Sequence, residues 1–426
     1  MRTHRLAEAD LDALATGLGG PALVGDLLLG QRSRRLLLLK LITERSPGLT
    51  AEHRHALAVL GEADRHDPRS VAALVDTPMF GSWCGSTLGL IAGGAEPWTV
   101  ERQLDRIVPY AAVAAHRAGI AAELLGRVHS GTVLLPTLGL MRLATGHQAQ
   151  VKFVSGSDGI WVDGREAALH TPGWQPLRVL RAPGPPAVAV PIDDLDPGRD
   201  SYHIEASPRL TSPTVARWQQ AFAATWQLVA RHLPERAAEL SVALRTVVPL
   251  RKPDLQAARS ATAREAVGAV GLDLPLSHAE FATTLVHEIQ HSKLTAVMDI
   301  EPLCAYSGEA TWFAPWRTDP RPLAGLLQGI YAFLGVADTW RALYTGSDGF
   351  PEAPKQFARA RADVTAAVEG IGPTDELTPA GRRFVAGMAA AVDRLGSVSV
   401  PRSLVAEAET RVAAKRVAWR RHRGLD

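Results

Sequence analysis

One short segment combines the residue types of a metal site. It reads His287-Glu288-Ile289-Gln290-His291, an HExxH pattern. Residues four apart share one face of a helix, so His287 and His291 are placed to bind one divalent metal together. Glu288 lies beside that face, within reach of a metal-bound water. The plainer interpretation is a pair of ordinary surface or core histidines on a helix.

The residues around this segment favour a helix. Ser277 is a candidate N-cap, and Glu280 follows it at the spacing of a capping box. Leu285, Val286 and Ile289 are apolar and suited to burial. We therefore expect the HExxH helix to be buried in a helical core.

A third metal ligand is expected downstream, and the sequence leaves its identity open. Asp299, Glu301 and Glu309 are the nearby acids. Asp299 lies about 120° off the histidine stripe of a straight helix. Glu301 precedes Pro302, which indicates that the helix ends there. Glu309 belongs to a separate segment that can fold back, so Asp299 and Glu309 both remain candidates.

A loop rich in arginine and proline follows the metal motif. The run FAPWRTDPRP, residues 313–322, contains Arg317 and Arg321 with three prolines and a tryptophan. Proline restricts the backbone, and a guanidinium in a stiff loop is suited to a bidentate grip on a carboxylate. The alternative is a structural loop in which an arginine stacks on Trp316.

Composition excludes several classes of protein. The chain has 426 residues, with 46 Lys and Arg against 44 Asp and Glu, a net charge of +2. This balance gives no electrostatic case for nucleic-acid binding. Cys84 and Cys304 form neither a CxxC motif nor a disulfide framework. We find no signal-peptide pattern and no apolar run of membrane-spanning length, so a soluble, cytoplasmic protein without a membrane partner is expected.

Periodicity predicts a mainly α fold with a small antiparallel β region. Residues 1–128 are expected to be an N-terminal helical region, with Gly and Pro between its segments. Residues 129–205 contain short β-rich runs separated by turn residues, with a hairpin turn at SGSDG. Residues 206–426 are expected to be a helical domain that holds the metal site.

Several stretches together resemble a known family. TLVHEIQHSKL (284–294) and FAPWRTDPRPLAGLLQGIYAFLGVADTW (313–340) resemble the α-ketoglutarate-dependent HExxH-type peptide β-hydroxylases, which are encoded beside precursors of ribosomal peptide natural products. Weaker likeness is found in DTPMFGSW (76–83), HSGTVLLPTLG (129–139), IDDLDPGRD (192–200) and TVVPLRKP (246–253), so the resemblance covers nearly the whole chain. HExxH followed by PWRxDPRP is far more specific than HExxH alone.

The resemblance implies a non-haem Fe(II) oxygenase. Such an enzyme uses O2 and α-ketoglutarate to hydroxylate a side-chain β-carbon of its precursor peptide. His287 and His291 match the family's metal motif. Our own inference is that Arg317 or Arg321 pairs with the distal carboxylate of α-ketoglutarate.

Two other functions fit the same residues. In a zinc metallopeptidase, Glu288 would be the general base that activates a metal-bound water. A non-catalytic partner in peptide maturation would keep the fold without needing the metal. Two histidines suit zinc as well as iron. The sequence identifies neither the peptide, the hydroxylated residue nor the oligomeric state.

Overall fold

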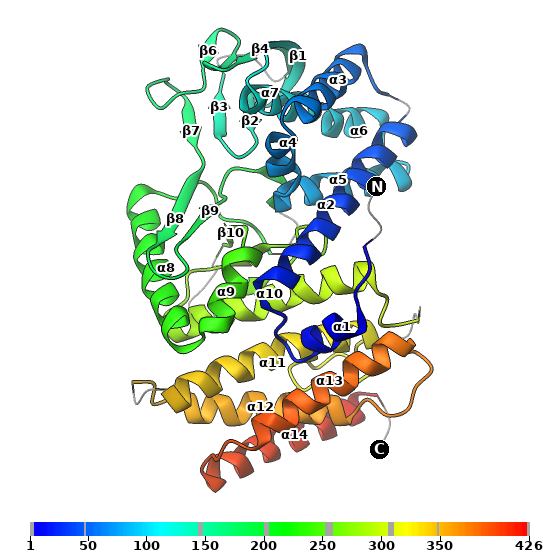
Figure 1. Ribbon diagram of the computed structural model, residues 1–426, viewed down its shortest axis with the longest axis vertical. Coiled ribbons are helices and arrows are strands. Elements are labelled where there is room, and N and C mark those ends of the chain that lie inside the picture. Colours follow the sequence, from blue (N-terminus) through cyan, green and yellow to red (C-terminus); the bar gives the residue numbers. More distant parts are fainter. Residues whose placement is uncertain are drawn as a thin grey trace.

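The computed structural model confirms the mainly α fold with small sheets (Figure 1). It describes residues 4–46, 48–143, 148–199, 204–251, 259–305, 311–346 and 349–423. The α-helices are α1 (Glu8–Ala15), α2 (Gly20–Arg45), α3 (Ala51–His66), α4 (Pro68–Val75), α5 (Pro78–Ala92), α6 (Pro97–Leu104), α7 (Ile107–Ala118), α8 (Ser212–His232), α9 (Pro234–Ala243), α10 (His278–Ile300), α11 (Leu323–Gly346), α12 (Ala353–Glu369), α13 (Pro379–Gly396) and α14 (Arg402–His422), with one 3-10 turn, η1 (Pro197–Arg199).

The strands form three sheets. One antiparallel sheet has the order β1-β4-β5-β6, from β1 (Ala122–His129), β4 (Gln148–Gly156), β5 (Gly159–Val162) and β6 (Arg165–Glu166). A second has the order β2-β3-β7, from β2 (Thr132–Leu135), β3 (Gly139–Arg142) and β7 (Trp174–Pro176). The third has the order β11-β12-β10-β9-β8, from β8 (Arg178–Ala182), β9 (Val188–Ile192), β10 (Thr246–Pro249), β11 (Ser260–Ala261) and β12 (Ala269–Leu272).

The third sheet differs from the expected antiparallel region. β10 pairs in parallel with both β9 and β12, and two of these strands lie beyond residue 205. All four residues of β10 and of β12 are buried. Strands buried on both faces lack the apolar–polar alternation that marks a half-exposed strand, which is why we did not expect them within a helical region.

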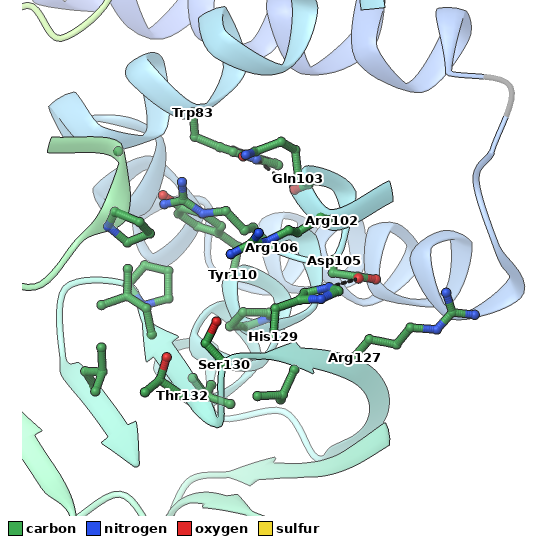
Figure 2. A pocket seen from close by; sticks show the side chains of 18 of the residues that line it. Trp83, Arg102, Gln103, Asp105, Arg106, Tyr110, Arg127, His129, Ser130 and Thr132 are labelled. Atoms are coloured by element: carbon green, nitrogen blue, oxygen red, sulfur yellow. Dashed lines mark hydrogen bonds and ion pairs between the residues drawn. The ribbon is translucent and has the colours of Figure 1, made fainter. Parts of the chain in front are cut away.

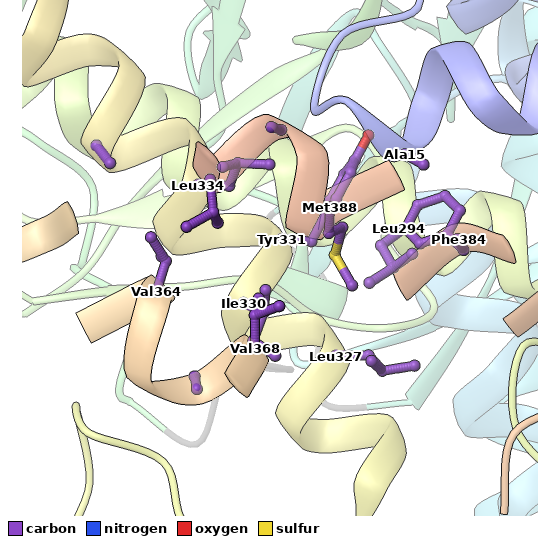
Figure 3. Packing of buried hydrophobic residues seen from close by; sticks show 14 of the residues in the cluster. Ala15, Leu294, Leu327, Ile330, Tyr331, Leu334, Val364, Val368, Phe384 and Met388 are labelled. Carbon is purple, nitrogen blue, oxygen red and sulfur yellow. The ribbon is translucent and has the colours of Figure 1, made fainter. Parts of the chain in front are cut away.

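Three large hydrophobic cores, and a small fourth one around Val248 and Ala269, hold the described residues together. The first joins α3–α7 to strands β1–β5, at the top of Figure 1. The second joins α8 and α9 to β8, β9, β10, β12 and the first half of α10. The third joins the second half of α10 to α1, α11, α12 and α13. In Figure 3, Leu294 of α10 and Tyr331 of α11 lie with Phe384 and Met388 of α13 in this last core.

These cores group the chain differently from the three expected regions. The limit at 128/129 falls at the end of β1, and most of the expected β-rich region shares its core with α3–α7. Strands β8 and β9 share theirs with the helices after residue 206. The division at 128 and 205 remains a prediction.

No single helix within the described residues is long and apolar enough to cross a membrane. One pair, α1 and α2, meets the length and composition criteria only when taken together, and it is bent by 110°.

Candidate metal centre

Helix α10 carries the HExxH motif through the centre of the protein. It begins at Ser277, whose side chain accepts a hydrogen bond from the backbone N–H of Glu280 at 3.1 Å. Phe281, Leu285 and Ile289 enter the second core, and Leu294 enters the third. Packing on both sides therefore fixes the rotation of the helix, and with it the direction of the histidine stripe.

His287 and His291 face one another on this helix. Their Nε2 atoms are 3.2 Å apart, and the rings are nearly perpendicular, at 87°. Two nitrogens bound to one metal at about 2.1 Å lie roughly 3.0 Å apart at a right angle and roughly 3.4 Å apart at the tetrahedral angle. The pair therefore has the separation that one shared metal ion requires.

Gln328 of α11 orients the second histidine. Its Nε2 donates to Thr295 Oγ1 at 3.2 Å, which turns its Oε1 towards Nδ1 of His291 at 3.1 Å. Nδ1 of His291 therefore carries the proton, and Nε2 keeps a lone pair that points at His287. Metal-binding histidines commonly have such a partner on the far ring nitrogen.

The first histidine is held neutral. Burial, and secondly the neighbouring His291, lower the pKa of His287 from 6.5 to about 3. Neutral imidazole is the form that binds a metal. Phe333 of α11 packs edge-on against the ring of His287, with centroids 5.2 Å apart.

The carboxylate of Glu288 lies beside the pair. Glu288 is buried, and its Oε1 is 3.9 Å from Nε2 of His287. Its Oε2 accepts a hydrogen bond from the hydroxyl of Thr262, which also donates to the backbone oxygen of Glu288 at 3.1 Å. One carboxylate oxygen is thus fixed by Thr262 and the other is directed to the histidine side.

The structure does not bring Asp299 to the histidines. Asp299 follows His291 by eight residues, about 12 Å along a helix. Its carboxylate accepts from Gln31 Nε2 at 2.9 Å and from Arg264 Nη2 at 3.1 Å. The other candidate, Glu309, lies outside the described residues. Within the described ranges, no cluster of three or more His, Cys, Asp or Glu side chains is arranged to hold a metal.

The arginine–proline loop packs onto the same site. Trp312 and Arg321 pair as an antiparallel bridge, which closes the loop at its base. Trp316, at its tip, stacks on Phe333 with ring centroids 4.6 Å apart and planes 13° apart. Because Phe333 also touches His287, the loop is joined to the histidine pair through two aromatic rings.

Both arginines of the loop pair with the same acid. Arg317 Nε donates to Asp319 Oδ1 at 2.8 Å, and Arg321 Nη1 lies 3.5 Å from Asp319 Oδ2. Arg317, as a result, holds the pKa of the Asp319 carboxyl below its usual value. Arg321 also lies against Gly325, where an added Cβ would be 3.2 Å from its Nε. Gly325 is one turn before Gln328 on α11, so Arg321 is on the helix face that carries Gln328, the partner of His291.

A buried polar network anchors α10 on another side. Lys293 Nζ donates to Glu239 Oε2 at 2.8 Å and to the backbone oxygen of Gly17 at 3.2 Å. Gln290 Nε2 donates to the same Gly17 oxygen at 3.0 Å. Gly17 has φ +88°, a conformation that favours glycine. These contacts tie α10 to α9 and to the turn between α1 and α2.

Sequence reasoning missed Gln328 and Thr262. Gln328 stands in the run LAGLLQGIYAFLG, where a single amide among apolar residues is a usable signal of a specific hydrogen bond. Thr262 gave no signal, because only the fold brings it beside Glu288.

No protein-family model matches this chain, and the curated proteins give no match to it either.

Proposed function

We propose that this protein is an Fe(II)- and α-ketoglutarate-dependent oxygenase that hydroxylates a side-chain β-carbon in a ribosomally made precursor peptide. The observation that carries the proposal is the facing Nε2 pair of His287 and His291, to which Trp316 and Phe333 join the loop of Arg317 and Arg321. In this reaction one atom of O2 enters the peptide as hydroxyl and the other enters succinate, with loss of CO2. The family resemblance in 284–294 and 313–340 supports the same reading.

The donor set fits iron held by two imidazoles with other positions open to cosubstrate and oxygen. When bound, the iron supplies the oxidation of the peptide C–H bond by O2. His287 and His291 hold the metal, and Gln328 keeps His291 in the tautomer whose Nε2 is free to bind. Phe333 and Trp316 exclude water from one side of the pair.

Arg321 is the better candidate for the distal carboxylate of α-ketoglutarate. It packs on α11 one turn from Gln328, whereas Arg317 is half exposed and borders a hollow with Trp419. Asp319 now pairs with both guanidinium groups, so the cosubstrate carboxylate would replace it. We expect Arg321→Lys to raise the α-ketoglutarate requirement by about ten-fold, because Lys loses the planar fork.

A second candidate is a zinc metallopeptidase, and the position of Glu288 favours it. Oε1 of Glu288 lies on the histidine side, and Thr262 fixes the other oxygen, as a general base for a metal-bound water would need. The third candidate, a non-catalytic maturation partner, needs neither feature.

One experiment separates the three functions. The protein is incubated with the precursor peptide encoded beside its gene, with either Fe(II), α-ketoglutarate and O2 or with zinc alone. Succinate release and a peptide heavier by one oxygen atom support the oxygenase. Peptide cleavage with zinc and no succinate support the peptidase, and tight peptide binding without either product supports the maturation partner.

A further inference from the structure

A second site is indicated by a hollow far from the metal helix. It lies between α5, α6 and α7 on one side and β1 and β2 on the other, in the upper tier of Figure 1. Its volume is about 800 Å³, and Figure 2 shows Trp83, Arg106, Tyr110 and His129 around it. A volume of this size is typical of ligand sites.

The hollow continues into a neighbouring one of about 770 Å³. The two share a border of Trp98, Arg102, Arg127, His129 and Ser130. Each alone would hold a small molecule, so the continuous groove has room for several residues of extended chain. The combined volume of the two hollows favours a peptide over a single small ligand.

Among the residues that the structure describes, the charges along the groove leave one cation unpaired. Arg106 donates to Asp196 at 2.8 Å, and Arg127 pairs with Glu101. Asp105 is shared by two histidines. Arg102 is exposed and has no hydrogen bond or ion pair to any residue that the structure describes. The groove therefore presents one available guanidinium, which complements a carboxylate.

The walls add an apolar surface. The side chain of Trp98 is 64% exposed at the border of the groove. Inside, Trp83 stacks on Tyr110 with centroids 5.3 Å apart. The hydroxyl of Tyr110 is buried, and no described group hydrogen-bonds to it. Because that hydroxyl lies beneath the surface, the wall offers a ligand its aromatic rings and not the hydroxyl.

We propose that this groove binds an extended acidic peptide segment, with a carboxylate on Arg102 and an apolar side chain against Trp98. The inference rests on the proposed function in one respect, namely that the substrate is a peptide. The groove holds part of that peptide remote from the residue that is modified.

Binding is tested by fluorescence anisotropy with two labelled probes, the peptide GELEFG and its counterpart GKLKFG. The full-length protein should bind the acidic probe at least about ten-fold more tightly, which corresponds to about 1.4 kcal/mol. Arg102→Ala should remove most of that preference. Arg102 is exposed, so this variant should fold.

Matched controls locate the effect. Arg69→Ala removes another exposed arginine outside the groove, and Arg416→Ala removes a charge from the basic helix α14; both should bind as wild type does. Equal affinity for the two probes, or an unchanged affinity in Arg102→Ala, overturns the proposal. Displacement of the peptide by free glutarate also overturns it, because glutarate has the charge without the apolar part.

The test is independent of turnover. The double variant His287→Ala, His291→Ala should still bind GELEFG, because neither histidine lines the groove. If the wild-type protein binds the acidic probe at Arg102 but shows no oxygenase activity on the precursor peptide, the proposed reaction is refuted and the peptide groove stands. Full activity on the precursor peptide with no groove binding would do the reverse.

Discussion

Two pairs of histidines occupy different parts of this molecule, and their surroundings differ in one decisive respect. His53 and His129 lie beside the groove formed by α5, α6, α7, β1 and β2, and the carboxylate of Asp105 lies between them. The Asp105 oxygens are 2.8 Å from Nε2 of His53 and 2.7 Å from Nε2 of His129. His287 and His291 have no acid between them, and their Nε2 atoms face one another directly at 3.2 Å.

The hydrogen bonds decide which pair is available to a metal. Nδ1 of His53 accepts from the backbone N–H of Thr50 at 3.2 Å, so its Nε2 carries the proton and donates to Asp105. That imidazole has no lone pair left. In the second pair, Nδ1–H of His291 donates a hydrogen bond to Oε1 of Gln328, so the lone pair on Nε2 of His291 stays open. The same residue type is thus structural in one place and a candidate ligand in the other.

The largest expected difference between the two pairs is in metal affinity, and removal of one histidine from each pair tests it. His287→Ala or His291→Ala should lower the affinity for Fe(II) or Zn(II) by more than about a hundred-fold, since loss of a ligand exceeds the cost of a lost outer-shell partner. His129→Ala should leave metal content unchanged. Metal analysis after dialysis measures both. Equal metal retention in His287→Ala and wild type would contradict the assignment.

Asp105→Ala tests the other half of the comparison. It leaves the buried Nε2–H of His53 without its acceptor, and His53 is only 1% exposed. The free energy of unfolding should fall by about 2 to 3 kcal/mol, while metal affinity stays the same. Chemical denaturation measures the change. Asp319→Ala, which removes an exposed ion pair, should cost less than about 1 kcal/mol. A similar small cost at Asp105 would show that its hydrogen bonds do not hold the pair.

Local sequence was sufficient to predict the HExxH helix. Helical spacing placed His287 and His291 on one face, and the Ser277 cap is present, because both depend on residues within a few positions. The same reasoning proposed Asp299, whose carboxylate instead pairs with Arg264 and Gln31 from other segments. Charge pairing across the fold, which no local pattern reports, determines where that side chain goes.

Long-range assembly also explains the other differences. β10 and β12 are four-residue strands with every residue buried, so their parallel pairing depends on partners far along the chain. The groove with Arg102 and Trp98 is lined by residues of α6, of β1 and of the segment near Pro197. His53, Asp105 and His129 are far apart in sequence, and no fixed spacing connects them, so the sequence does not predict their contact.

The acid sensitivity of the metal-free protein should come partly from the metal helix. The pKa of His287 is about 3 in the folded state and 6.5 ordinarily, so between these values the unfolded chain binds more protons. The contribution of His287 to the free energy of unfolding is therefore fully present above pH 6.5 and is lost as the pH falls. At pH 5 the loss is at most about 2 kcal/mol. Denaturation at several pH values should show a shallower loss in His287→Leu. His170→Leu, at an exposed site, should keep the wild-type slope, and an unchanged slope in His287→Leu would contradict the prediction.

Gln328→Leu should have the smallest effect among these variants, a moderate loss of metal affinity. It removes the acceptor that holds the Nδ1 proton of His291, so the imidazole is free to rotate or to move its proton to Nε2. Metal affinity should fall about ten-fold, or 1.4 kcal/mol, with both ligands still present.

Gln328→Glu keeps an oxygen acceptor at that position and should retain the affinity. Gln219→Leu removes an amide that bonds the backbone of Arg181 far from the histidines and should leave metal binding unchanged. Competition against a chelator of known affinity measures all three variants. If Gln328→Leu binds metal as wild type does, packing alone orients His291, and the difference between the two histidine pairs does not depend on their hydrogen-bond partners.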